Sequence, residues 1–167
     1  ITEKYDPQVL RFFMLSAHYR SPLNFSADLM QSAKTSLERI VTAAENLKHL
    51  IDNAKDEGMN ESETAHFDAT EEYVKKFEEA MDDDFNTADA IAAIFELVKY
   101  LNTHTSAENS KSYLQNCLNR LKTLCDILGL VVDKKEELLD ADIETLIAER
   151  QQARKEKNFA RADEIRA

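Results

Sequence analysis

The sequence predicts an all-α protein: a helical connector, an antiparallel helix bundle and a short C-terminal helical extension. The chain of 167 residues contains two Gly and two Pro, too few for the frequent turns of a sandwich, a barrel or a doubly wound sheet. Apolar residues make up 43% of it, and along most of the chain they recur at alternating spacings of three and four. No apolar run approaches the roughly 18 residues that a membrane-spanning helix needs. We therefore expect a soluble helical protein.

The first helix is predicted from Pro7 to about His18. Asp6 can accept the unpaired amides of the first turn, and Pro7 supplies the backbone angle that the first helical position requires. Pro22 ends this region, because a residue that precedes proline avoids the helical conformation. Ser26 is the expected N-cap of a long second helix.

Heptad-like stripes predict the bundle. In the second helix the stripe consists of Met30, Ala33, Leu37, Ile40, Ala44, Leu47, Ile51 and Ala54. The same spacing predicts a third helix across residues 67–81, a fourth across 88–98 and a fifth across 114–128. Four such stripes can bury one another only by facing a common axis, which is the arrangement of a bundle.

Residues 131–135 are predicted to form a short charged connector, because they carry no helical stripe. Two more helices are expected beyond it, at 143–156 and from 159 to the end. A domain boundary is expected between residues 130 and 140.

The net charge of −11 is distributed unevenly. Residues 51–110 hold four basic and sixteen acidic groups, whereas the segments on either side are close to neutral. A polyanion would be repelled by this middle segment and could be received only at the ends of the chain.

Several kinds of site are excluded or disfavoured. Cys117 and Cys125 lie eight residues apart on one predicted helix, about 12 Å, which is too far for a disulfide. Buried core thiols are favoured over zinc ligands. Residues 82–86 resemble the start of a calcium loop, but Thr87 and Ala93 stand where Gly and Glu are needed, so a solvated loop with a helix cap is favoured. The four histidines show no ligand spacing, and no phosphate loop or catalytic motif is present.

One cationic pattern leaves two interpretations open. Arg150, Arg154, Lys157 and Arg161 recur at spacings of four, three and four, so one helix would align them as a stripe that can follow a phosphate backbone. Phe159 among them could stack on an unpaired base. The alternative is an ordinary solvated face with a buried phenylalanine, since acidic residues are interleaved with the stripe.

Three stretches of the chain together carry a family resemblance. They are Lys4-Tyr5-Asp6-Pro7-Gln8-Val9-Leu10-Arg11-Phe12-Phe13 with Ser16-Ala17-His18-Tyr19-Arg20-Ser21-Pro22-Leu23-Asn24-Phe25-Ser26, then Met81-Asp82-Asp83-Asp84-Phe85-Asn86-Thr87, and finally Arg150-Gln151-Gln152-Ala153-Arg154-Lys155 with Ala160-Arg161-Ala162-Asp163-Glu164-Ile165-Arg166. In this order and spacing they resemble the C-terminal half of cysteinyl-tRNA synthetases, the class I cysteine–tRNA ligases.

The resemblance implies a parent enzyme that activates cysteine with ATP and transfers it to its cognate tRNA, with zinc in a catalytic domain that would precede Ile1. The chain itself is then expected to be inactive, without a cofactor or metal site of its own. Residues 1–27 would be a stem-contact connector that follows the Lys-Met-Ser-Lys-Ser loop, residues 28–132 a DALR-type anticodon-binding bundle, and residues 133–167 the start of an anticodon-recognition region.

By this resemblance the residues that meet the anticodon are Arg154, Phe159 and Asp163. Further candidates for tRNA contact are Arg11, Arg20, Arg150, Lys157 and Arg161. The implied partners are tRNA specific for cysteine and the parent's catalytic domain, in the cytoplasm, without membrane or DNA. The alternative hypothesis is a structural bundle or coiled-coil oligomerisation module with no RNA role, based on the heptads of residues 30–54.

Overall fold

A computed structural model describes residues 5–133. The described residues belong to one compact unit. Within the described range there are six helices and no strand, so the predicted all-α class is confirmed. The helices are α1 (Pro7–Leu15), α2 (Ala27–Asn53), α3 (Glu61–Ala69), α4 (Glu71–Asp82), α5 (Thr87–His104) and α6 (Lys111–Ile127). None of these six is long and apolar enough to cross a bilayer.

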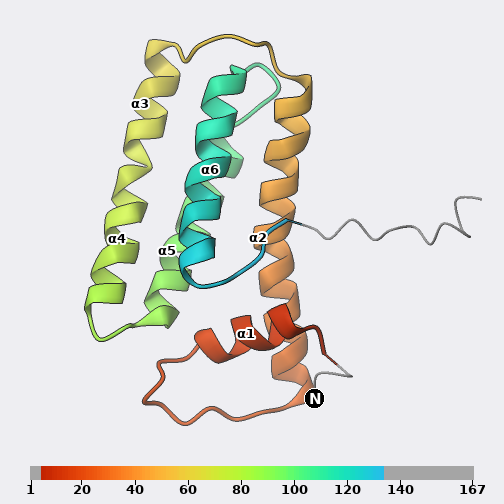
Figure 1. Cartoon of the computed structure of the whole chain (residues 1–167), viewed down its shortest axis with the longest axis vertical. Helices are drawn as coiled ribbons and strands as arrows, with labels where there is room; N and C mark the ends of the chain where they lie inside the picture. The colour runs from red at the N-terminus through yellow and green to blue at the C-terminus, as the bar shows by residue number, and fades with distance from the viewer. Residues whose placement is uncertain (1–4, 134–167) are drawn as a thin grey trace, which may run out of the picture. The chain divides into compact units, whose positions relative to one another are not determined.

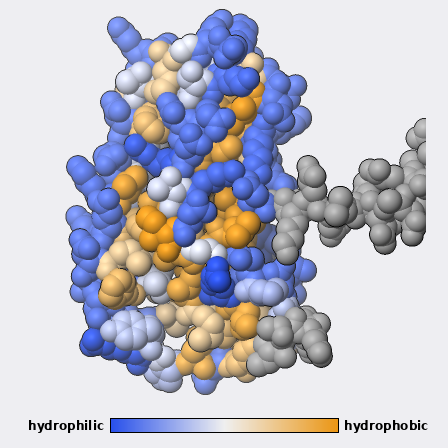
Figure 2. All heavy atoms as spheres, viewed as in Figure 1, coloured by the Kyte–Doolittle hydropathy of each residue, from blue (hydrophilic) through white to orange (hydrophobic). Residues whose placement is uncertain are grey.

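The long helices alternate in direction (Figure 1). Helix α2 rises along one side, α3 and α4 descend as one broken column, α5 rises again and α6 descends through the centre. Helix α1 lies across the lower end of α2 and packs on both α2 and α5. Hydrophilic residues cover the outer edges, while hydrophobic residues gather between the helices in the middle of this face (Figure 2).

The predicted helix starts are confirmed by their caps. The Asp6 carboxylate accepts a hydrogen bond from the Gln8 amide at 2.7 Å, and Ser26 Oγ accepts one from the Leu29 amide at 3.2 Å. Asn86 caps α5 in the same way, as the solvated-loop interpretation of residues 82–86 expected.

The predicted third helix is wrong in one respect, because it is broken at Thr70 into α3 and α4. The Phe67 carbonyl accepts hydrogen bonds from the Thr70 amide, from Thr70 Oγ1 and from Arg120 Nη1 of α6. Arg120 also donates to Thr70 Oγ1 and pairs with Glu71 at 3.2 Å. Arg120 of α6 thus hydrogen-bonds to the Phe67 carbonyl. In an unbroken helix this carbonyl would accept the amide of the residue four positions later.

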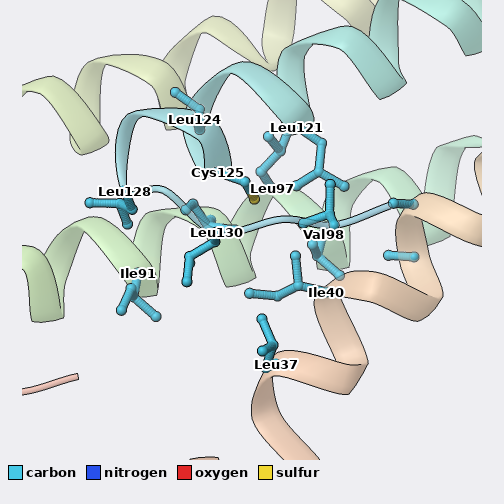
Figure 3. Close-up of a cluster of buried hydrophobic side chains, with 14 of the residues drawn as sticks. Leu37, Ile40, Ile91, Leu97, Val98, Leu121, Leu124, Cys125, Leu128 and Leu130 are labelled. Carbon is cyan, nitrogen blue, oxygen red and sulfur yellow. The ribbon is translucent and has the colours of Figure 1, made fainter. Parts of the chain in front are cut away.

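The stripes meet in one core (Figure 3). Ile40, Leu97 and Leu121 are buried where α2, α5 and α6 converge. Cys117 and Cys125 are also fully buried, which confirms them as core thiols. In α2 the buried members of the stripe are Met30, Ala33, Leu37, Ile40, Ala44, Leu47 and Ile51. The heptads on which the oligomerisation hypothesis rested are therefore covered by the chain's own bundle.

The segment after α6 packs part of its length against the core. Gly129 turns the chain with φ +65°, and the Leu130 amide donates to the Cys125 carbonyl at 2.9 Å, the helix-ending geometry that favours glycine. Leu130 then buries its side chain in the core (Figure 3). Val132 is buried as well. The burial of this strap, residues 129–133, was not predicted from the sequence, because burial of alternate residues leaves no helical stripe.

Side chains of α1, α2 and α6 hold this strap in place. Arg11 Nη1 donates to the Gly129 carbonyl, and Gln8 Oε1 accepts from the Val131 amide at 3.0 Å. The Asp133 carboxylate pairs with Lys48 of α2 and Lys122 of α6, both at 2.7 Å. Hydrogen bonds from these two lysines lower the pKa of Asp133.

A buried carboxylate joins α3 to α6. Glu63, 3% exposed, forms a capping box with Asn60 and accepts hydrogen bonds from the Ser110 amide (2.8 Å), Ser110 Oγ (2.7 Å) and Asn109 Nδ2 (3.1 Å). Burial raises the pKa of Glu63, but the hydrogen bonds from Ser110, Asn60 and Asn109 outweigh it, so the net pKa is lowered. The ionised form is therefore the one that the fold stabilises.

Replacing Glu63 with Gln tests this latch. The amide group of Gln would set N–H groups against the donors of residue 110, and we expect a loss of about 1–3 kcal/mol at pH 7. Because the folded-state pKa of Glu63 is lowered, its stabilisation exists above the unfolded pKa of about 4.3 and disappears as pH falls through the folded value. Urea unfolding at pH 7 and at pH 3.5 should show the difference between wild type and variant shrinking in acid. Exposed Glu61→Gln, two residues away, should be near neutral at both pH values.

The two glycines provide a second test. Gly129→Ala should destabilise the protein by about 1–2 kcal/mol, because an alanine would have to keep φ +65° and its Cβ would meet Arg11 Nη1 at 2.6 Å. Gly58 has no positive φ, and a Cβ there would meet nothing within 4 Å. Gly58→Ala should therefore be neutral or stabilising by up to about 1 kcal/mol. Equal effects at the two positions, measured by thermal unfolding, would contradict this account of the turn.

Candidate functional site

Two of the three family-like stretches meet in space. The segment after α1 and the turn between α4 and α5 are joined at Asp84, 64 residues from Arg20. Tyr19 donates its hydroxyl to Asp84 at 2.8 Å, and Arg20 Nη2 pairs with the same carboxylate at 3.1 Å. His18 lies 3.8 Å from that carboxylate and stacks on the Tyr19 ring. One carboxylate thus contacts three side chains of the segment that follows α1.

The backbone of the α4–α5 turn has an unusual conformation. Asp84 and Phe85 both have positive φ, +55° and +53°, a region that bulky side chains rarely adopt. Hydrogen bonds from the Phe85 amide to the Met81 carbonyl and from the Asn86 amide to the Ala80 carbonyl hold the turn closed. Thr87 Oγ1 also donates to the Leu15 carbonyl at the end of α1. The result is that the Phe85 ring is 66% exposed.

Exposed aromatic groups accompany this turn. Tyr19 is 62% exposed beside its polar contacts, and Arg20 lies over its ring at 5.4 Å. Asp82 and Asp83 are exposed as well, so carboxylates outnumber cations here. The charge of Arg20 is balanced by Asp84. The surface around the α4–α5 turn therefore presents aromatic rings and carboxylates.

The structure locates two of the predicted site residues. Arg11 lies on α1 against Gly129, and Arg20 lies against the α4–α5 turn, so they contact different segments. Both guanidinium groups are exposed and already engaged within the chain. The other predicted residues lie outside the described residues: Arg150, Arg154, Lys157, Phe159, Arg161 and Asp163.

Sequence reasoning missed one grouping of titratable residues. His66 of α3 and His104 of α5 have ring centroids 4.7 Å apart, and Tyr100 bonds to His66 Nδ1 at 3.2 Å. The two histidines are 38 residues apart, and nothing in local spacing joins them. Over residues 5–133 no group of three His, Cys, Asp or Glu side chains is placed to hold a metal ion.

Comparison with known proteins identifies relatives over nearly the whole chain. Residues 76–132 match the DALR domain family. The chain is 64% identical over 166 residues to a protein of Lachnospira eligens named cysteine–tRNA ligase, and 52% identical over 171 residues to one of the same name from Lachnoclostridium phytofermentans. These matches cover 99% of this chain but 35% and 36% of the two relatives. The resemblance drawn from the three stretches is confirmed, and the chain spans about a third of its relatives' length.

Because of the positive φ of Phe85, we expect two substitutions at this position to change the stability of the protein in opposite directions. Phe85→Asn should stabilise the protein by about 0.5–1 kcal/mol, because asparagine tolerates positive φ and little apolar burial is lost from an exposed ring. Phe85→Val should destabilise it by a similar or larger amount, because β-branched side chains are the least compatible with this conformation. Urea unfolding curves decide between them. Destabilisation by both substitutions would show that the contacts of the Phe85 ring stabilise the fold by more than its positive φ destabilises it.

Proposed function

Because residues 76–132 match the DALR family and the chain aligns over 99% of its length with a third of two cysteine–tRNA ligases, we propose that it is the tRNA-binding and positioning part of such a ligase. The identity of 64% over 166 residues carries this proposal. The packing of the described helices around one core supports it, because a rigid bundle can hold the side chains of its own surface in fixed positions.

The uneven charge supports different roles for the middle and the ends of the chain. The acidic segment 51–110 contains the last residues of α2, all of α3, α4 and α5, and the turns between them. Its surface repels a phosphate backbone, so RNA is guided to the ends of the chain. The bundle then serves as a spacer that also disfavours non-specific polyanions.

The contact residues are proposed from their chemistry. Arg154 supplies a fork of donors for a base edge or phosphate, Phe159 a stacking face, and Asp163 an acceptor for a guanine edge. Arg150, Lys157 and Arg161 would follow the phosphate backbone.

The connector, residues 1–27, is proposed to touch the tRNA stem. Arg11 and Arg20 each spend part of their guanidinium group on internal hydrogen bonds, at Gly129 and Asp84. An arginine has five N–H donors, which leaves further donors for a phosphate oxygen. Their internal contacts would hold these cations in place before RNA arrives.

The proposed parent reaction is the ATP-dependent attachment of cysteine to its tRNA in the cytoplasm. ATP and zinc would be held by a catalytic domain that is not among these residues, and the part of the chain that the structure describes offers no metal cluster of its own. Because that catalytic domain would hold ATP and zinc, we expect the 167-residue chain alone not to charge tRNA. Formation of cysteinyl-tRNA by the purified chain would contradict this assignment.

Binding of tRNA tests the proposal directly. Sedimentation of the chain with tRNA specific for cysteine should show a complex that weakens as salt rises, because phosphate neutralisation releases counterions. Arg154→Glu and Arg161→Glu should each weaken binding by about tenfold or more, since each replaces an attraction by a repulsion. Lys34→Glu, an equal charge change on exposed α2, should have little effect. A chain that self-associates and retains no tRNA at low salt would favour the oligomerisation hypothesis instead.

A further inference from the structure

A solvent-open groove between α4 and α5 is lined by aromatic and charged side chains. Its volume is about 400 Å³, within the range of small-molecule sites. Tyr73 and Lys76 line it from α4. The residues that line it from α5 are Glu96, Lys99, Tyr100, Thr103 and His104.

Aromatic rings form a continuous wall in this groove. The Tyr73 and Tyr100 rings lie 5.6 Å apart, and Tyr100 stacks on His104 with centroids 4.0 Å apart and planes at 19°. The Tyr100 hydroxyl donates to the His66 carbonyl, and His104 Nδ1 lies 2.9 Å from the Tyr100 carbonyl oxygen. Hydrogen bonds therefore hold the wall in place before any ligand arrives. An ordered aromatic wall offers a stacking surface to a planar ring.

The charge of the groove differs from that of its surroundings. Residues 51–110 contain four lysines and arginines against sixteen acidic residues. Two of those four cations, Lys76 and Lys99, line the groove, together with one of the sixteen carboxylates, Glu96. With Glu72, which pairs with Lys76 beside the lining, two cations face two carboxylates here, whereas the segment as a whole has a net charge of −12.

The two lysines play different parts. Lys76 is held between Glu72 at 2.9 Å and Glu96 at 2.8 Å and lies over the Tyr73 ring, so its charge is already balanced. Lys99 is exposed, and among the described residues it has no carboxylate within ion-pair distance. Thr103 donates its hydroxyl to the Lys99 carbonyl at 2.9 Å, which leaves its oxygen as an acceptor. An anionic group that enters the groove would therefore meet Lys99.

We propose that the α4–α5 groove binds a nucleotide unit, with its base against the Tyr73 and Tyr100 rings and its phosphate on Lys99. Stacking on aromatic rings beside a cation is the usual chemistry of unpaired nucleotides on proteins. The unit can belong to a single-stranded RNA segment or be a free nucleotide, since both present the same base and phosphate. This inference concerns side chains of α4 and α5 and does not depend on the tRNA contacts proposed for residues 150–163.

Titration of the 167-residue chain by two-dimensional amide NMR tests the groove. The probes are adenosine monophosphate, a six-nucleotide adenylate RNA and inorganic phosphate. We expect both adenine probes to shift the amides of Tyr73, Lys99 and Tyr100 in a saturable manner and phosphate alone to leave them unchanged. A response to the RNA but not to the mononucleotide identifies an RNA site, and the reverse identifies a free-nucleotide site. Shifts with phosphate of the same size as with the nucleotide, or no saturable shift at all, would overturn the proposal.

Two variants and a matched control sharpen the test. Lys99→Glu should weaken binding of the adenine probes by about tenfold, because a charge-assisted contact becomes a repulsion. Tyr73→Leu should weaken it by about tenfold through lost stacking. Lys75→Glu makes the same charge change on exposed α4 outside the groove and should change the affinity less than twofold. Since Lys99 is exposed, its variant keeps the test valid even if Tyr73→Leu fails to fold. Equal effects of the Lys75 and Lys99 variants would contradict a defined site.

Discussion

The constraint on which the structure depends is that each helix can bury only a narrow apolar stripe, so the stripes must close on a common axis. Four helical columns meet around side chains such as Ile40 and Leu97, which have no exposed surface. The last gaps are filled from outside the columns, by α1 below and by Leu130 and Val132 after α6. The beginning and the end of the unit are thereby locked to the same core.

Polar groups decide how the helices join at their ends. The carboxylate of Glu63 satisfies amides and hydroxyls at the starts of α3 and α6, and Arg120 occupies the carbonyl at which α3 gives way to α4. Each of these two side chains links segments that lie about fifty residues apart in the sequence. Because a buried polar group without a partner is costly, such contacts select one register of the helices over its neighbours.

The lower end of the bundle combines features that a structural role alone does not require. Asp84 adopts a positive φ, gathers Tyr19 and Arg20 and leaves Phe85 exposed. The sequence identified both contributing stretches as family-like, but it did not predict that they touch. Most of the cationic residues chosen from spacing and resemblance, such as Arg154, lie beyond the described range and remain predictions. The described residues as a whole carry more acidic than basic side chains.

The sequence by itself determined the helical class, the helix starts at Asp6 and Ser26 and the burial of the α2 stripe, because caps and stripes act within a few residues of each other. Only the tertiary structure decided the break at Thr70 and the burial of Leu130. Those depend on Arg120, fifty residues from Thr70, and on a core assembled from several helices. The periodicity of a local stretch shows which face of a helix is apolar. It does not show which distant side chains will pack against that face.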